Sequence, residues 1–295
     1  MPHPAPWIGF EDLCALLRDH TVAVLSGAGL STESGIPDYR GPDTRDRDHS
    51  PIRYGAFVKS ERARRHYWAR SALGWPSFDA AVPNAGHRAL AALEAAGRVT
   101  GVITQNVDRL HQAAGSERVV ELHGALAEVI CLGCGARSER RTLQARLRAR
   151  NPDWADRAAT LGPDGDADLP RSATRDFRVP PCRACGGALK PNVVFFGENA
   201  PSPRVEAAWA MLREADALLV VGSSLTVYSG YRFVRGADEA AQPIGIVNLG
   251  ETRGTPLASV HVDGRTGAVL PRLAEALEGR APPSALTDQP SRHDQ

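Results

Sequence analysis

The chain has 295 residues, a hydrophobic content of 42% and a formal net charge of +1. This length allows one large domain or two unequal ones, and the near-neutral charge gives no electrostatic support for a nucleic acid or membrane partner. No apolar run approaches the roughly 18 residues of a membrane span, and the N-terminus has neither a signal nor a transit pattern. We therefore expect a soluble, cytoplasmic protein.

The first predicted elements are a helix over residues 9–20 and a strand over residues 22–25. The strand is an apolar run typical of burial on both faces. Small residues then follow at positions 26–29 (SGAG), where the backbone can turn tightly and approach a ligand. The polar stretch 31–34 can start a helix whose free N–H groups favour a phosphate. This order predicts the first strand–turn–helix unit of a nucleotide-binding fold.

The turn differs from the dehydrogenase pattern G-x-G-x-x-G. Its third glycine would fall at Thr32, and residues 43–48 form a polar loop where an acidic residue should end a second strand. A hydride-transfer enzyme is therefore disfavoured, whereas a dinucleotide ligand is not.

Helices and strands alternate along much of the remaining chain. We expect helices over residues 60–71, 84–96, 202 onwards, 231–241 and 266–279, and a short one through His111. We expect strands over residues 99–104, 119–122, 217–221, 244–247 and 258–262, with the α/β pattern resuming at residues 191–198. Such alternation predicts a Rossmann-like, doubly wound parallel sheet, which binds ligands beyond the carboxyl ends of its strands. Several polar or small residues fall there: Gly27, Asn106, His123, Gly222, Ser223, Ser224 and Asn248.

Two Cys-x-x-Cys pairs lie in the middle of the chain, Cys131 with Cys134 and Cys182 with Cys185. In a cytosolic protein this pattern indicates a metal site. Four thiolates fill a tetrahedral zinc site, so we predict a structural zinc ion; a redox dithiol or cysteines without metal are the alternatives.

Residues 125–190 hold both pairs and show no βα alternation, so we predict an inserted zinc module. The dinucleotide-binding domain would then be discontinuous, over residues 8–124 and 191–280. Residues 281–295 form a polar tail that we expect to be disordered.

Several motifs together carry a resemblance to a known family. Residues 27–31 (GAGLS) and 35–40 (GIPDYR) resemble the opening motif of the sirtuins, the NAD-dependent protein lysine deacylases. Residues 104–111 (TQNVDRLH), 121–124 (ELHG), 196–198 (FGE) and 222–224 (GSS) resemble further sirtuin motifs, and the resemblance covers roughly residues 8–280. Residues 67–70 (YWAR) and 227–231 (VYSGY) resemble the class II branch, which includes a mitochondrial sirtuin of animals.

The resemblance implies NAD as cosubstrate and acylated lysine side chains of proteins as substrates, with nicotinamide and O-acyl-ADP-ribose as products. It implies that His123 is the general base, a task that suits imidazole because its pKa lies near operating pH, and that Asn106 is also catalytic. The implied cofactor contacts are Gly27, Ala28, Gly29, Ser31, Asp38, Tyr39, Arg40, Gln105, Asn106, Asp108, Gly222, Ser223, Ser224, Asn248, Leu249 and Thr266. The implied substrate contacts are Val194, Phe195, Phe196, Gly197 and Glu198.

Tyr67 and Arg70 bear on the choice of acyl group. They share one helix face and resemble a pair with which some sirtuins bind acidic acyl groups, since Arg offers a bidentate fork to a carboxylate. The hypothesis is a preference for acidic or bulky acyl groups; the alternative is an exposed Arg beside a core Tyr.

Two other functions stay open. One is NAD-dependent mono-ADP-ribosyl transfer to proteins, which uses the same ribose chemistry with another acceptor. The other is a non-catalytic NAD-sensing zinc protein, against which the intact set of Asn106, Asp108 and His123 argues. We expect a monomer without nucleic acid or membrane partners.

Overall fold

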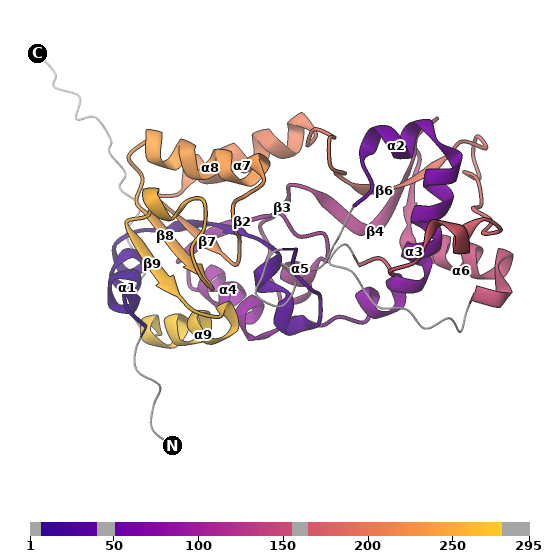
Figure 1. Cartoon of the computed structure of the whole chain (residues 1–295). Coiled ribbons are helices and arrows are strands. Elements are labelled where there is room, and N and C mark those ends of the chain that lie inside the picture. The colour runs from indigo at the N-terminus through magenta and orange to yellow at the C-terminus, as the bar shows by residue number, and fades with distance from the viewer. Residues whose placement is uncertain (1–6, 40–50, 155–164, 279–295) are drawn as a thin grey trace, which may run out of the picture.

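The computed structural model describes residues 7–39, 51–154 and 165–278. These residues form a six-stranded parallel sheet with helices on both faces and a smaller part around a three-stranded antiparallel sheet (Figure 1). The expected doubly wound parallel sheet is confirmed. Arg40, the loop 42–50 and the tail from residue 281 lie outside the described residues.

The parallel sheet has the strand order β3-β2-β1-β7-β8-β9. Its strands are β1 (Val22–Ser26), β2 (Val99–Thr104), β3 (Val119–Glu121), β7 (Ala217–Val221), β8 (Ile244–Asn248) and β9 (Val260–Asp263). Every residue of β1 and β7 is buried, as expected for apolar strands covered on both faces. Because all neighbours in this sheet run parallel, the six carboxyl ends lie along one edge.

Five helices cover the two faces of this sheet. One core cluster contains residues of α1 (Phe10–Asp19), α4 (Ala85–Ala95) and α9 (Thr266–Leu277), and another those of α7 (Ser202–Glu214) and α8 (Tyr228–Glu239). The side chain of Asn84 accepts hydrogen bonds from two backbone N–H groups of α4 and so caps this helix. The short α5 (Leu110–Ala113) carries His111.

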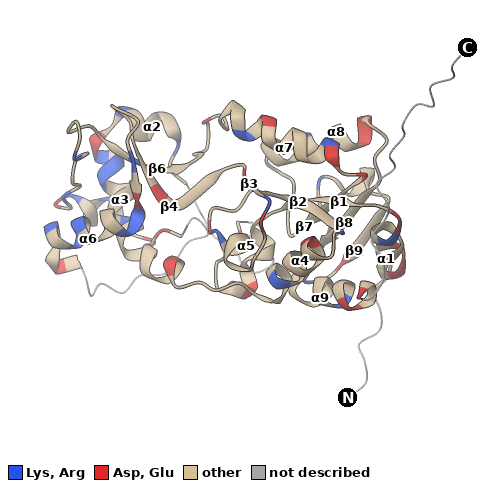
Figure 2. Ribbon diagram, turned by 180° about the vertical axis from the view of Figure 1, so that it is seen from behind, with Lys and Arg blue, Asp and Glu red and all other residues tan. Residues whose placement is uncertain are grey.

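The smaller part contains β4 (Gly124–Cys131), β5 (Arg137–Glu139) and β6 (Leu189–Val193), with the helices α2 (Tyr54–Lys59), α3 (Glu61–Asp79) and α6 (Arg140–Arg150). A third core joins Trp68 of α3 and Leu143 of α6 to Val129 of β4. Short 3₁₀ turns add Pro152–Trp154, Arg171–Thr174 and Thr255–Leu257. Basic residues are frequent on α3 and α6, whereas α7 and α8 carry both signs (Figure 2).

Several predicted elements need correction. Residues 31–34 do not start an α-helix; Ala28–Leu30 and Thr32–Ser34 are two 3₁₀ turns, because Gly35 adopts φ 84° and ends the second one. The strand expected to resume the α/β pattern near residue 191 is β6, which pairs antiparallel with β4 instead of joining the parallel sheet. The predicted division into domains stays a prediction.

Helix ends also differ from expectation. The helix predicted over residues 60–71 begins after the cap Ser60 and continues to Asp79, with Pro76 inside it. Helix α8 begins at Tyr228 instead of residue 231, whereas α7 begins at Ser202 as expected. Within the described ranges, none of the helices combines the length and apolar character needed to cross a membrane.

Candidate active site

A cavity of about 780 Å³ lies at the carboxyl edge of the parallel sheet. Loops that follow β1, β2, β3, β7, β8 and β9 line it, together with residues of α3, β4 and the segment after β6. The predicted catalytic, cofactor and substrate residues that the structure describes all line this cavity except Arg70. They are Gly27, Ala28, Gly29, Ser31, Asp38, Tyr39, Tyr67, Gln105, Asn106, Asp108, His123, Val194, Phe195, Phe196, Gly197, Glu198, Gly222, Ser223, Ser224, Asn248, Leu249 and Thr266.

The loops after β1 and β7 approach so closely that two glycines have no space for a side chain. A Cβ atom on Gly27 would lie 2.7 Å from Cβ of Ser223, and one on Gly29 would lie 2.9 Å from the carbonyl oxygen of Gly222. The N–H of Gly29 donates to that same oxygen at 2.8 Å. Small residues at these positions are therefore required by the contact between the two loops.

Asn106 and Asp108 are joined to the loop after β1 through Ser31. The Asn106 amide donates to the carbonyl oxygen of Gly27 and to Oγ of Ser31, both at 3.1 Å, and Ser31 Oγ donates to Asp108 Oδ2 at 2.7 Å. Burial raises the pKa of Asp108, while hydrogen bonds from the N–H of Leu110 and from Ser31 act in the opposite direction. These bonds hold the amide and the carboxyl group in fixed orientations at the cavity wall.

His123 is bonded at both ring nitrogens. Nδ1 lies 3.0 Å from the backbone oxygen of Gln105, and Nε2 lies 2.8 Å from Oγ of Ser229. Because a carbonyl oxygen only accepts, Nδ1 carries the proton and Nε2 is the basic nitrogen. Burial is the main cause that lowers the pKa of His123 to about 4; the hydrogen bond to Gln105 opposes it, and the charges of Arg232 and Arg204 contribute to the lowering. His123 is thus a neutral imidazole near pH 7, but the expectation that its pKa lies near operating pH needs correction, because burial disfavours the charged ring.

An ion pair and a hydrogen bond hold residues 194–198, the segment after β6, in place. The buried Lys190 places Nζ 2.9 Å from Oε2 of Glu198, and the same oxygen accepts the backbone N–H of Phe195 at 2.9 Å. Phe196 is 39% exposed between these anchors, so an aromatic surface remains available at the mouth of the cavity.

Of the two residues predicted to select the acyl group, Tyr67 lies at the cavity and Arg70 does not. Tyr67 lines the cavity and packs against Phe195 with ring centroids 5.3 Å apart. Arg70 does not line the cavity formed by the described residues; it is 8% exposed, and its Nε donates to the backbone oxygen of Ala167 at 2.7 Å. The alternative of an exposed Arg is therefore wrong.

The four predicted metal ligands come together at one end of the small sheet. Their Sγ atoms all lie within 4.8 Å of one another, with 3.4 Å between Cys131 and Cys185 and 3.9 Å between Cys134 and Cys182. Tetrahedral zinc–thiolate bonds of about 2.3 Å imply sulfur separations of about 3.8 Å. The backbone N–H of Cys134 is the main cause that lowers the pKa of the Cys131 thiol to about 6. The donor set and spacing fit a structural zinc ion.

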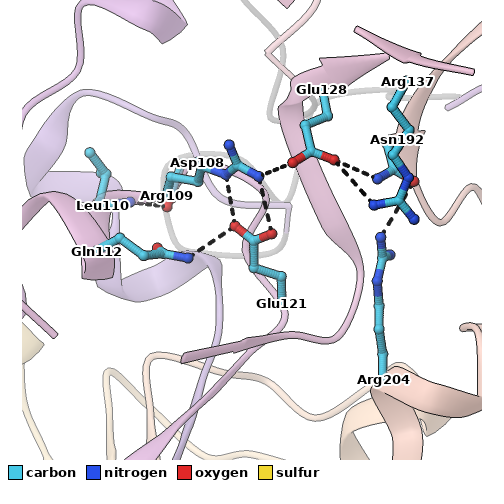
Figure 3. Close-up of polar contacts among 9 residues, drawn as sticks. All are labelled: Asp108, Arg109, Leu110, Gln112, Glu121, Glu128, Arg137, Asn192 and Arg204. Carbon is cyan, nitrogen blue, oxygen red and sulfur yellow. Dashed lines mark hydrogen bonds and ion pairs between the residues drawn. The ribbon is translucent and has the colours of Figure 1, made fainter. Parts of the chain in front are cut away.

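A polar network links the two sheets beside the cavity (Figure 3). The guanidinium of Arg109 lies 3.0 Å from Glu121 of β3 and also pairs with Glu128 of β4. The other oxygen of Glu128 accepts from the amide of Asn192 in β6 at 2.8 Å, and Asn192 in turn contacts Arg204 of α7. Opposite charges raise the pKa of Arg109 despite its partial burial. The network therefore ties the loop that carries Asp108 to the small sheet.

Several residues that line the cavity were not predicted as site residues, and two of them lie on α8. Ser229 and Arg232 both line the cavity from the first turns of α8. Ser229 was named only within the motif 227–231, and Arg232 lay inside the predicted helix 231–241, so neither was assigned to the cavity. Their proximity to residues 222–224, at the carboxyl end of a core strand, was the signal that could have found them.

The fold and the cavity define a dinucleotide-binding α/β protein with an accessory four-cysteine module. A family model described as "Sir2 family" matches residues 27–229 of this chain. "NAD-dependent protein deacetylase 1" of Streptomyces coelicolor is 57% identical over 261 residues, covering 88% of this chain and 87% of the relative. "NAD-dependent protein deacylase Sirt4" of Drosophila melanogaster is 48% identical over 281 residues, which cover 92% of this chain and 89% of the relative.

Solved structures agree with these matches. A structure described under "Structural Basis for the Mechanism and Regulation of Sir2 Enzymes" has a TM-score of 0.72 and 33% identity, and covers 92% of this chain and 98% of its own. A structure of Sir2 with a p53 peptide and NAD⁺ has a TM-score of 0.70 and 30% identity. The match covers 90% of this chain and 97% of the solved chain. The chain therefore belongs to the Sir2 family, the sirtuins.

Proposed function

We propose that this protein is an NAD-dependent protein lysine deacylase in which His123 is the general base. The relatives named NAD-dependent protein deacetylase and deacylase support this activity. The observation that carries the residue assignment is the neutral imidazole of His123 in the same cavity as Asn106 and Asp108. When bound, NAD would supply an electrophilic ribose carbon, to which the amide oxygen of the acyl-lysine bonds as nicotinamide leaves with the electron pair of the broken C–N bond.

The cavity wall suggests where each part of NAD binds. The closely packed backbone of Gly27, Gly29 and Gly222 offers space for the pyrophosphate, and Asn248 with Thr266 lies at the adenosine end. The fixed amide of Asn106 and carboxyl group of Asp108 match the donor–acceptor edge of a carboxamide, so we place nicotinamide there.

His123 acts after nicotinamide has left. Its Nε2 would take the proton of a ribose hydroxyl, whose oxygen bonds to the acyl carbon. Water would then add at that carbon as its bond to the lysine nitrogen breaks and the nitrogen takes a proton. The bond from Nδ1 to the carbonyl of Gln105 holds the tautomer that this step requires and stabilises the imidazolium that forms. The zinc ion stays with the small sheet and takes no part.

The peptide and the acyl group would enter from the side of the small sheet. We place the peptide backbone along residues 194–198 as an added strand, beside the exposed ring of Phe196. The wall near Tyr67 is apolar, which favours bulky over acidic acyl groups. It comprises Ile52, Tyr67, Phe78, Val107, Leu126, Val193 and Phe195.

Mass spectrometry with NAD and a panel of acyl-lysine peptides tests the proposal. The wild type should form nicotinamide and O-acyl-ADP-ribose, and His123→Ala should reduce product formation by about a hundredfold or more, because general-base catalysis contributes that much. His20→Gln, at the end of α1, is the matched control and should keep wild-type turnover.

The outcome also decides between the functions left open. ADP-ribose attached to protein, without loss of the acyl group, would favour ADP-ribosyl transfer. NAD binding without nicotinamide release from any peptide would favour a sensing role, and either result would overturn the deacylase proposal.

A further inference from the structure

Ser229 forms a hydrogen bond with the basic nitrogen of His123. Its Oγ lies 2.8 Å from Nε2 of His123, the nitrogen that accepts a proton in the proposed reaction. Since Nδ1 donates to the carbonyl of Gln105, Nε2 is the acceptor and the Ser229 hydroxyl is the donor. Ser229 also lines the cavity, so a substrate bound there can lie next to it.

The first turn of α8 holds Ser229 in this position. The guanidinium of Arg232 donates from Nε to the backbone oxygen of Ser229 at 3.1 Å. A Cβ atom on Gly230 would lie 2.4 Å from Oε1 of Gln105, so the helix start rests directly on the residue that orients His123. The amide of Gln105 donates in turn to Oγ of Ser223 at 2.8 Å. Ser229, His123 and Gln105 are therefore one packed unit, with the hydroxyl fixed relative to the imidazole.

We propose that Ser229 is a catalytic residue that relays the proton from the ribose hydroxyl to His123. The Oγ–H bond of Ser229 breaks as the new H–Nε2 bond forms. At the same time Oγ takes the proton of the ribose hydroxyl, whose oxygen keeps the electron pair that bonds to the acyl carbon. Ser229 ends unchanged and His123 ends as an imidazolium, so protons and electrons balance. This inference rests on the proposed function and adds a residue to it.

The order of the reaction supplies a selective test. Nicotinamide departs before His123 is needed, so exchange of labelled nicotinamide into NAD, in the presence of an acyl peptide, reports the first step alone. Ser229→Ala should lower the rate of O-acyl-ADP-ribose formation by about tenfold or more while leaving this exchange within about twofold of wild type. Ser229→Thr, which keeps the hydroxyl in the first turn of the helix, should restore product formation.

A second readout does not depend on turnover. NMR titration of His123 in the protein without ligands should show that its pKa rises in Ser229→Ala, because a donor that stabilises the neutral ring is removed. The charges that face the ring, Arg204 of α7 and Arg232 of α8, are unchanged in that variant. Ser202→Ala removes an exposed hydroxyl from the first turn of α7 and is the matched control for both experiments.

Each outcome bears on one of the two proposals. Equal losses of nicotinamide exchange and product formation in Ser229→Ala would mean that Ser229 has a structural role. Unchanged or faster product formation would mean that Ser229 merely occupies the site of the ribose hydroxyl. Either result would overturn the relay. If the wild type neither exchanges nicotinamide nor forms product with any peptide, the proposed deacylase function fails instead. A full relay requires both the selective loss and the rescue by Thr.

Discussion

At the scale of single residues, Arg70 separates two kinds of acyl specificity. A pocket for acidic acyl groups needs its guanidinium in the cavity, yet the structure directs Nε to the backbone of Ala167 and leaves Tyr67 at the wall. We therefore expect Arg70→Met to slow glutaryl-peptide and acetyl-peptide turnover by the same factor, since a buried polar bond is lost without any change in the pocket. The ratio of the two kcat/KM values measures this directly.

Arg65→Met is the control on the same helix, because Arg65 pairs with Glu61 and the backbone of Arg175 away from the cavity wall. It should leave both rates near wild type. A selective loss of glutaryl turnover in Arg70→Met would instead show that the guanidinium reaches the acyl carboxylate, as the sequence pattern suggested.

At the scale of elements, Arg109 fastens the loop after β2 to β3 and β4. Its backbone has φ 63°, a left-handed conformation that is costly for a residue with a side chain, and its ion pairs with Glu121 and Glu128 offset that cost. We expect Arg109→Ala to raise the KM for NAD, because Asp108 precedes it directly and loses its support. Arg109→Gly loses the same pairs but relieves the backbone, so it should be more stable than Arg109→Ala by about 1 kcal/mol.

Steady-state kinetics and urea unfolding measure these two effects. Arg118→Ala removes a half-exposed pair with Glu214 and should change stability by less than about 1 kcal/mol. If both Arg109 variants kept the wild-type KM for NAD, the network would stabilise the fold without positioning the cofactor loop.

The elements also show what the sequence could and could not predict. Strands with apolar runs, such as β1 and β7, follow from local composition, and parallel pairing then brings Asn106, His123 and Ser223 to one edge. Spacing likewise brought the four cysteines together correctly.

Contacts between distant segments were beyond such reasoning. The sequence did not reveal that β6 pairs with β4, because antiparallel partners are chosen by long-range packing. Nor did it reveal that α8 begins early enough to place Ser229 at His123, or that Arg109 reaches Glu128 of the other sheet. Side-chain direction was equally hidden for Arg70, whose helix position alone suggested the cavity.

At the scale of the whole molecule, three histidines with lowered pKa values tie stability to pH. Burial lowers the pKa of His87 to about 4, of His111 to about 3 and of His123 to about 4. His87 and His111 lie with ring centroids 5.1 Å apart, and Nδ1 of His87 accepts the N–H of Asn84 at the start of α4. A proton on that nitrogen would break the helix cap, so the folded state keeps these rings neutral.

The sign of the effect follows from proton binding. The unfolded chain protonates each histidine near pH 6.5, whereas the folded protein does so only near its lower pKa, so stability falls as pH drops below 6.5. At pH 5.5 each of the three rings costs about 1.4 kcal/mol, or roughly 4 kcal/mol together, relative to pH 7.5. Urea unfolding at the two pH values measures the difference.

Two carboxyl groups with lowered pKa values act outside this window, whereas Asp108, whose pKa burial raises, opposes the effect of the histidines. The hydrogen bond from Thr21 chiefly lowers the pKa of Asp216, and hydrogen bonds from Arg109 and Asn192 lower that of Glu128 against the cost of burial. Their contributions are present above the ordinary carboxyl range and are lost only as pH falls through the lowered values, below about pH 4. Because Asp108 acts in the opposite direction, the comparison is made in Asp108→Asn. A free energy of unfolding of that variant that stayed constant between pH 7.5 and 5.5 would mean that the folded protein protonates these histidines, and that burial does not hold His123 as a neutral base.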